Sequence, residues 1–290
     1  STYINISSSN LFYNECEIKS NRSIIKTKEF INKGVFNFDY LNVIMDQPSV
    51  NEGVINGNKV NLYLGENSVF SSKNTFVAKI LIIKGVKNSR FINEGTCQIL
   101  NGDFWVGSHF QDSENSIVIL KNSKIELLSE SFKINGTFVI DSPKSFNTPE
   151  NFDIYINNNA KFIVKNCGFN WSNFENNGLF ELYNGKSNGS GIYKSGKKSI
   201  TLFFDDFEFN AKLFDENGIT KSQKGIELLC GTGVSNWGFY DINGTIKFSV
   251  PDQSIPYFRK NLENIIYPSE NHNKTQLNVN PCFSKRSLKI

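Results

Sequence analysis

Short alternating runs of hydrophobic and polar residues are separated by Asn and Gly, and one phrase of this kind recurs along the chain. An aromatic residue stands four positions before a glycine in most copies, Asn just before it, and an apolar residue two positions after it. The glycines of the six copies are Gly34, Gly53, Gly95, Gly136, Gly178 and Gly244. Their separations are 53 − 34 = 19, 95 − 53 = 42, 136 − 95 = 41, 178 − 136 = 42 and 244 − 178 = 66. Multiples of about 21 predict the coil of a parallel β-solenoid, because helical repeats and propeller blades are longer.

Alignment on the glycine sorts the side chains by the face they should occupy. Two residues after it stand Phe36, Ile55, Cys97, Phe138, Phe180 and Ile246. Four residues after it stand Phe38, Gly57, Ile99, Ile140, Leu182 and Phe248, and four before it stand Phe30, Ser49, Phe91, Phe132, Phe174 and Tyr240. Because strand side chains alternate between faces, we expect these positions to point into the coil and to stack as ladders. We expect Asn and Gly to supply left-handed backbone at the corners.

An antiparallel β-sandwich with regularly spaced hairpins is the alternative to this fold. A sandwich has no reason to hold one phrase in phase over such a length of chain. The segments between the copies also begin with Asn and continue as strand-like runs, at Asn67, Asn115, Asn122 and Asn159. The pattern therefore favours the solenoid.

The rhythm divides the chain into two predicted parts. Residues 1–200 are expected to form the β-helix, with 1–29 as a cap over its first coil. A Gly/Ser/Asn-rich loop over 184–198 interrupts the strands, and 201–290 are expected to form a smaller β module packed on the solenoid. Because Tyr240–Ile246 matches the phrase, the last coil extends that far in an alternative division. Residues 256–266 are the one predicted helix, with apolar residues on one face.

Composition agrees with a turn-rich β structure that is poor in helices. About one residue in seven is Asn, and a single Met is present. The formal net charge is +3, from 31 basic and 28 acidic residues, and no basic stripe indicates nucleic acid. The longest apolar run, near 76–86, is too short to span a bilayer, so no membrane contact is expected. We expect a monomer.

Potential N-glycosylation sequons indicate a secreted protein. The acceptor residues are Asn5, Asn21, Asn135, Asn170, Asn188, Asn243 and Asn273. Of the five cysteines, Cys230 and Cys282 are the predicted disulfide, because both lie in the C-terminal region. Cys97 occupies an inward position and is expected to be a small buried apolar residue. The partners of Cys16 and Cys167 stay open.

Asp205 and Asp206 form the one adjacent carboxylate pair with the appearance of an enzyme site. Hydrolases with a β-helix fold use clustered aspartates on polysaccharides, which makes a polysaccharide hydrolase or lyase an alternative function. Neighbouring strand residues point to opposite faces, however, and a turn or a solvated edge explains the pair. Calcium needs six to eight oxygens, and no further Asp-rich loop accompanies the pair. We therefore expect no enzyme, no metal and no cofactor.

Two further groups are weak candidates for ligand contact. Trp105 and His109 lie within a Gly-flanked segment, where a solvent-facing Trp stacks on a sugar or a partner, although such a Trp is more often part of a core. Lys194, Lys197 and Lys198 offer a small basic surface, or simply a solvated loop.

The phrases over 91–97, 132–138 and 174–180, together with the sequons and the Asn content, resemble the N-terminal region of yeast hyphally regulated cell wall proteins. These include the Awp-type adhesin-like wall proteins of Candida. The resemblance implies a right-handed β-helix followed by a smaller β-sandwich, secretion, and display on the fungal cell wall through a stalk with a GPI anchor. It implies adhesion to host or abiotic surfaces or to biofilm components, through a glycan or protein ligand. An architectural wall protein without a specific ligand is a further alternative.

Overall fold

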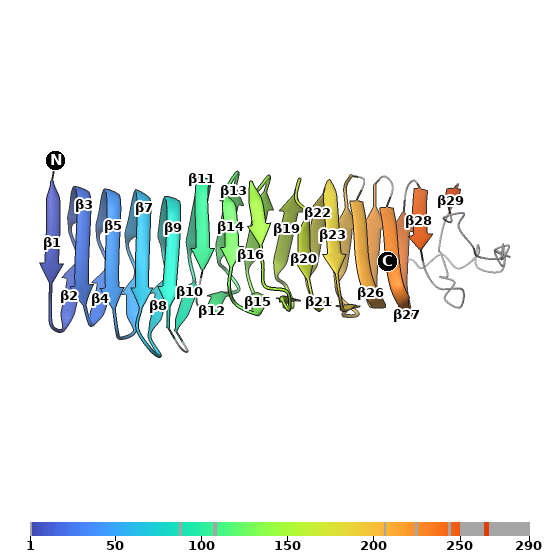
Figure 1. Cartoon of the computed structure of the whole chain (residues 1–290), viewed down its shortest axis with the longest axis horizontal. Coiled ribbons are helices and arrows are strands. Elements are labelled where there is room, and N and C mark those ends of the chain that lie inside the picture. The colour runs from blue at the N-terminus through green and yellow to red at the C-terminus, as the bar shows by residue number, and fades with distance from the viewer. Residues whose placement is uncertain are drawn as a thin grey trace.

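The computed structural model describes residues 2–86, 89–106, 109–205, 207–223, 226–242, 245–249 and 264–266, and describes side chains as far as residue 223. The strands stack side by side along one axis, which makes the molecule an elongated rod (Figure 1). Neighbouring strands pair in parallel throughout the described residues, which contain no helix. The predicted all-β parallel solenoid is confirmed.

Each coil contributes strands to three stacked rows, which we call sheets 1, 2 and 3. Sheet 1 contains β2 (Leu11–Asn14), β4 (Glu29–Asn32), β6 (Ser49–Asn51), β8 (Val69–Ser72), β10 (Arg90–Asn93), β12 (His109–Asp112), β15 (Ser131–Ile134), β18 (Asp153–Ile156), β21 (Phe174–Asn176) and β24 (Ile192–Ser195). Sheet 3 begins with β1 (Tyr3–Ser7). In the early coils, each long bent strand forms part of sheet 2 with its first half and part of sheet 3 with its second half. These are β3 (Glu17–Thr27), β5 (Val35–Met45), β7 (Val54–Leu64), β9 (Thr75–Gly85) and β11 (Thr96–Val106).

After β11 the two halves become separate strands. Sheet 2 continues as β13 (Ile117–Lys121), β16 (Thr137–Asp141), β19 (Lys161–Lys165), β22 (Leu179–Tyr183) and β25 (Ile200–Phe203). Sheet 3 continues as β14 (Lys124–Leu127), β17 (Ser145–Asn147), β20 (Phe169–Trp171) and β23 (Gly185–Gly189). The last strands are β26 (Phe207–Ser222), β27 (Ile226–Ile242), β28 (Thr245–Ser249) and β29 (Asn264–Ile266).

Partners in neighbouring coils lie at variable sequence separations. Along the inward position of sheet 2 the separation is 36 − 18 = 18 residues between Ile18 and Phe36. It reaches 162 − 138 = 24 between Phe138 and Phe162. Corners of different length account for the difference. At the corner between sheets 2 and 3, β11 has three residues, 100–102, where β9 has Lys79 alone. The predicted period of about 21 is thus an average over coils of different length.

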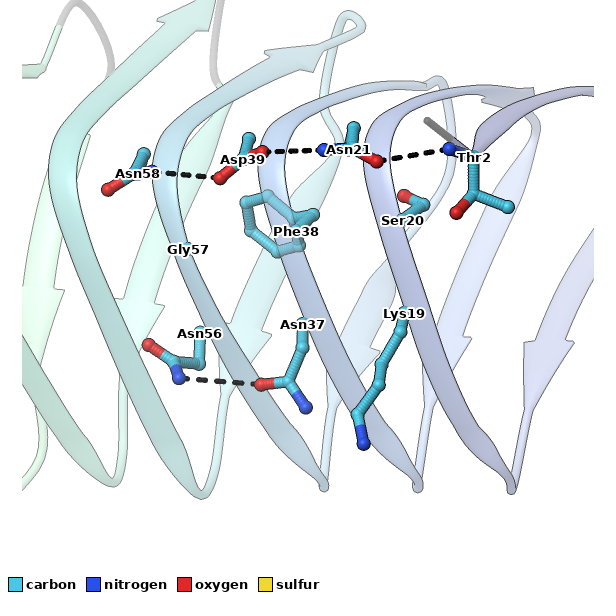
Figure 2. A pocket seen from close by; sticks show the side chains of 10 residues that line it. All are labelled: Thr2, Lys19, Ser20, Asn21, Asn37, Phe38, Asp39, Asn56, Gly57 and Asn58. Atoms are coloured by element: carbon cyan, nitrogen blue, oxygen red, sulfur yellow. Dashed lines mark hydrogen bonds between the residues drawn. The ribbon is translucent and has the colours of Figure 1, made fainter.

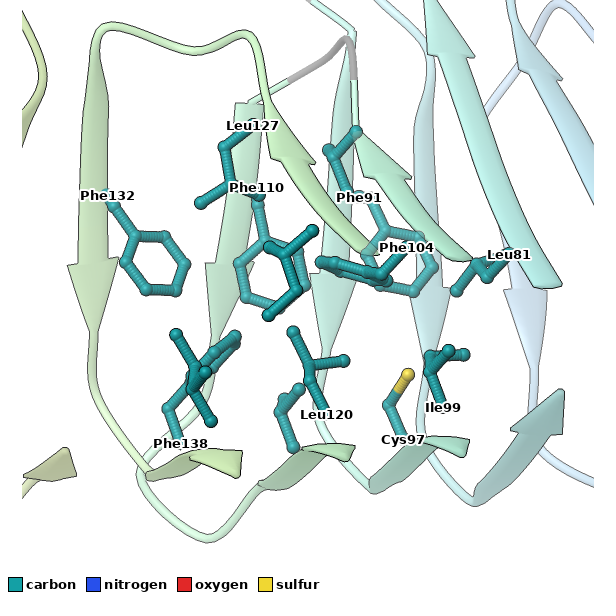
Figure 3. Packing of buried hydrophobic residues seen from close by; sticks show 14 of the residues in the cluster. Leu81, Phe91, Cys97, Ile99, Phe104, Phe110, Leu120, Leu127, Phe132 and Phe138 are labelled. Carbon is teal, nitrogen blue, oxygen red and sulfur yellow. The ribbon is translucent and has the colours of Figure 1, made fainter. Parts of the chain in front are cut away.

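Aromatic side chains stack along the interior of the rod as predicted. Figure 3 shows Phe91, Phe110 and Phe132 of successive sheet 1 strands pointing into the same buried space. Their ring centroids are 5.7 Å and 5.6 Å apart. Ser49 interrupts this ladder, and the rings of Phe30 and Phe70 approach to 6.2 Å across it. Interdigitated rings of this kind dominate the energetics of a core.

The inward positions of sheet 2 are likewise buried. Phe36, Ile55, Cys97, Phe138, Phe180, Ile99, Ile140 and Leu182 are all buried. Burial raises the pKa of the Cys97 thiol to about 12, which agrees with its prediction as a small apolar residue.

The repeated glycines serve close backbone packing, so the predicted left-handed conformation at these positions is wrong. None of the motif glycines over 34–178 has a positive φ. A Cβ added at Gly95 would lie 2.2 Å from the carbonyl oxygen of Asn74 in the preceding coil. The same clash arises at Gly53, at 2.0 Å from the carbonyl oxygen of Gly34. Glycine is therefore required where one coil crosses closely over the next.

Asn residues form two kinds of ladder. Inside the corner after sheet 1, the Nδ2 of Asn14 donates to the Oδ1 of Asn32 at 2.8 Å, and Asn32 donates to Asn51 at 2.7 Å. A second ladder lies outside, at the corner between sheets 2 and 3. Its members have positive φ and include Asn101 at 59° and Asn122 at 49°. Asn thus supplies the left-handed corners that were expected of both Asn and Gly.

The stack continues beyond residue 200. β26 pairs in parallel with β23, β24 and β25, and β27, β28 and β29 follow in the same direction. In the described residues from 207 to 249, the strands thus continue the solenoid, as in the alternative division of the chain. At the other end, residues 3–14 pair as an ordinary coil with β3 and β4 and do not form a distinct cap.

Two further expectations at the C-terminal end are wrong. Tyr240 pairs with Thr220 in the sheet 2 part of the stack and not with the aromatic ladder of sheet 1. The phrase over 240–246 is therefore a chance match in an Asn/Gly-rich chain, and Ile246 belongs to the sheet 3 row. Asn264–Ile266 of the predicted helix form β29. The other residues of that helix, and the side chain of Phe248, lie outside the described part.

Candidate functional site

A shallow polar pocket lies at the corner between sheets 2 and 3 near the N-terminal end (Figure 2). Asp39 accepts a hydrogen bond from the Nδ2 of Asn21 at 3.0 Å and another from the Nδ2 of Asn58 at 2.9 Å. A second row runs beside it, in which Asn56 donates to Asn37 at 3.4 Å. The pocket therefore presents two lines of amide and carboxylate groups along the rod. We call Asn21, Asp39, Asn58, Asn37 and Asn56 the Asn–Asp corner.

The floor of this pocket depends on one glycine. The ring of Phe38 lies between the two rows and occupies the space beside Gly57 (Figure 2). A Cβ at Gly57 would lie 2.2 Å from the Phe38 ring. Gly57 thus makes room for an aromatic ring that fills the inward positions of two coils.

Aromatic and basic side chains cover the outward face of sheet 3, directly beside this corner. We call the face the aromatic–basic face and define it as Tyr3, Arg22, Tyr40, Lys59, Tyr63, Lys84 and Trp105. These residues come from β1, β3, β5, β7, β9 and β11. From β3 to β11 they are neighbours of buried positions on the same strands. Each coil adds one strand to the face, so its members lie along the axis of the rod.

The cations of this face lie against the aromatic rings. The guanidinium carbon of Arg22 is 5.9 Å from the ring centroid of Tyr3 and 5.3 Å from that of Tyr40. The Nζ of Lys84 is 5.6 Å from the ring of Tyr63 and 5.9 Å from that of Trp105. Lys59 approaches Tyr40 to 5.9 Å. Such contacts hold long cationic side chains in place without neutralising their charge.

Carboxylates are absent from the outward rows of sheet 3 between β1 and β9, whose residues are all described. The rows carry Arg22, Lys26, Lys59 and Lys84, together with Tyr, Ile, Asn and Ser residues. Asp103 in β11 is the first acidic residue in these rows. The described ion pairs involve other lysines. From β1 to β9 the face is therefore positive although the charge of the whole chain is nearly balanced.

The buried carboxylate of Asp112 was not predicted from the sequence. Asp112 of β12 takes the position that Asn93 has in the preceding coil. It is fully buried and accepts hydrogen bonds from the backbone amides of Asn135 and Gly136, at 2.6 Å and 3.0 Å. Burial raises the pKa of Asp112 to about 6 in spite of these donors. Its place inside the rod argues for a structural role, and its signal in the sequence is the substitution of Asp for Asn in the corner ladder.

The predicted contact residues lie apart from one another. Trp105 is half-buried and belongs to the aromatic–basic face. His109 begins β12, and its side chain lies outside the described part. Lys194 is exposed on β24, and Lys197 and Lys198 are exposed in the following turn, several coils away. The structure therefore separates the Trp from the basic cluster, and sequence reasoning missed the other members of the face.

Asp205 lies in the bend after β25, whereas Asp206 is outside the described residues, so the geometry of the predicted carboxylate pair is not tested. Within the described part of the chain, no three His, Cys, Asp or Glu side chains cluster in a way that would hold a metal ion. Nor does that part form any helix with the length and apolar character needed to cross a bilayer.

The sequons differ in their accessibility. The side chains of Asn5, Asn21, Asn170 and Asn188 are exposed. Asn135 is half-buried, and its Nδ2 donates to the carbonyl oxygen of Asp112 at 2.6 Å. In the folded protein this amide is therefore less accessible to a glycosylating enzyme than the four exposed ones. Asn243 and Asn273 lie outside the described residues.

Three of the five cysteines have described side chains. Cys16, Cys97 and Cys167 carry free thiols. The backbone of Cys230 lies in β27, and Cys282 is outside the described residues, so the predicted disulfide stays a prediction.

Comparisons with known proteins assign no family to the chain. No family model matches it, and no solved structure matches it. It is 36% identical over 104 residues to ABC transporter C family member 6 of Dictyostelium discoideum. The match covers 36% of this chain and 7% of that transporter, so the chain spans only a small part of that protein's length.

Proposed function

We propose that the chain is a non-enzymatic binding rod that is displayed on the surface of a fungal cell and mediates adhesion. The observation that carries the proposal is the aromatic–basic face with the adjoining Asn–Asp corner. Together they form an open contact surface that runs along several coils. A rigid solenoid with an elongated face suits projection from a wall and contact with extended ligands. The exposed sequons Asn170 and Asn188 lie in β20 and β23, away from this face, and agree with a secreted protein.

An attachment assay tests this function. The chain is displayed on a non-adherent yeast, and attachment of the cells to plastic and to host-cell monolayers is counted. Cells that display the Phe132→Ala variant at equal level serve as the control, because loss of the buried Phe132 ring unfolds or loosens the rod. We expect several-fold more attachment with the unaltered chain.

Two results would speak against the proposal. One is a correctly folded, displayed chain that gives no attachment above the control. The other is release of soluble sugars from cell-wall or plant glycans that Asp205→Asn together with Asp206→Asn abolishes, which would favour the polysaccharide hydrolase or lyase.

A further inference from the structure

We infer that the aromatic–basic face binds a linear acidic polysaccharide that lies along the axis of the rod. The inference rests on the proposed function as a binding rod and names the ligand class and the contact residues. Its first basis is charge, because four cations and no carboxylate occupy the outward rows of sheet 3 from β1 to β9. A face of one sign selects a ligand of the opposite sign.

The geometry of the face favours a chain-like ligand. Arg22, Tyr40 and Lys59 are register partners in three successive coils. Because neighbouring parallel strands are about 4.8 Å apart, the backbones of the cationic residues Arg22 and Lys59 lie about 10 Å apart along the axis. That spacing is the length of a disaccharide unit, and many acidic polysaccharides carry one carboxylate in each such unit.

The chemistry of the neighbouring groups favours a sugar. The Asn–Asp corner follows the same coils and offers amide groups to hydroxyls. Asp39 lies in the middle of its first row and accepts a hydrogen bond from Asn21 and another from Asn58. Partly exposed rings such as Tyr63 and Trp105 offer flat surfaces to the C–H face of a pyranose. Tyr40 is held in place by a 2.9 Å hydrogen bond from the Nδ2 of Asn61.

Binding of the full chain to hyaluronan tests the inference. This polymer has one carboxylate in each disaccharide, and dextran is the neutral comparison. We expect hyaluronan binding that weakens when salt is raised from about 0.05 M to about 0.5 M, because exposed charges are screened. Dextran should bind more weakly. Equal affinity for dextran and hyaluronan would overturn the inference.

Two double variants with the same change in net charge locate the site. Arg22→Gln with Lys59→Gln removes cations of the face, and we expect about a tenfold loss of hyaluronan affinity. Lys197→Gln with Lys198→Gln removes exposed cations elsewhere on the rod and should change the affinity less than about twofold. Trp105→Ala removes a ring that can stack on a pyranose and should weaken binding about fivefold. Circular dichroism and thermal unfolding confirm that each variant is folded.

Further outcomes separate this inference from the proposed function. An equal loss in both double variants overturns the inference, because binding would then follow net charge alone. Tighter binding of phosphatidylserine vesicles or of single-stranded DNA than of hyaluronan, lost in the Arg22/Lys59 variant, also overturns it. If the displayed rod promotes attachment but hyaluronan does not bind, the inference fails and the adhesive function stands. If attachment and all polymer binding are absent, both fail.

Discussion

At the scale of single residues, the recurring glycine is explained by crowding between coils. Gly34, Gly53, Gly95, Gly136 and Gly178 each face a backbone carbonyl or its neighbours at distances that a Cβ does not permit. Beside Gly34 and Gly53, the buried side chains of Asn14, Asn32 and Asn51 pass a hydrogen bond from one coil to the next. A buried amide that is bonded in this way avoids the cost of an unsatisfied polar group.

Substitution of a motif glycine tests this explanation. Gly95→Ala should lower the free energy of unfolding by about 1–3 kcal/mol, because the new methyl group collides with the carbonyl oxygen of Asn74. Gly168→Ala is the matched control, since the nearest atom to its Cβ is the carbonyl oxygen of Lys186 at 3.2 Å. It should cost less than about 1 kcal/mol. Urea unfolding compares the two, and equal losses would contradict the role assigned to Gly95.

Asp112 predicts a pH dependence of stability with a defined sign. Its pKa in the folded protein is about 6, above the ordinary value of 3.8, so the folded state binds a proton that the unfolded state has released. The contribution of Asp112 to stability is therefore greatest below about pH 4 and falls as pH rises through about 6. Asn at this position does not titrate.

The variant Asp112→Asn isolates this contribution. Relative to the unaltered protein, the variant should gain up to about 3 kcal/mol of unfolding free energy between about pH 4 and about pH 7. Thermal and urea unfolding at a series of pH values measure the difference. A constant difference between the two proteins across this range would show that Asp112 keeps its ordinary pKa.

At the scale of the strand, stability comes from rings that stack between coils. Phe132 contacts Phe110, Phe138 and Phe152, with ring centroids 5.6 Å, 4.8 Å and 6.2 Å away. Its neighbour Lys133 points outward on the same strand. Residues that contribute much to stability through burial therefore alternate along the strand with exposed residues that contribute little.

Truncation of these two neighbours should therefore have very different effects. Phe132→Ala should cost about 3–5 kcal/mol, because a cavity replaces a buried ring. Lys133→Ala should stay within about 0.5 kcal/mol, because the side chain is exposed. The midpoints of chemical unfolding measure both. Similar shifts would contradict the assignment of Phe132 to the interior.

The sequence predicted most strands of the coils but not every position in them. Phe91, Phe132 and Phe174 follow the period because a buried ladder restricts residue type. Tyr240 was assigned to the wrong row, since coils of 18 to 24 residues blur the phase over a long distance. Asn and Gly occur in turns of many kinds, so a short phrase of them matches by chance.

At the scale of the whole molecule, the aromatic–basic face could not be predicted from local sequence. Arg22, Tyr40 and Lys59 are far apart in the chain, and only the register between coils brings them into one row. That register depends on the number of residues in each corner between the strands. Trp105 alone was recognised, because a Trp in a Gly-flanked segment is conspicuous in any sequence.

Distances between spin labels along one outward row of sheet 2 test the stacked solenoid most directly. Lys19, Gln98, Val139 and Lys221 lie in this row at coil steps of zero, four, six and ten. Double electron–electron resonance should give distances from Lys19 of about 19 Å to Gln98, about 29 Å to Val139 and about 48 Å to Lys221. These distances rise linearly, by about 4.8 Å for each coil. Distances that do not rise in proportion to the number of coils would contradict the stacked, in-register rod.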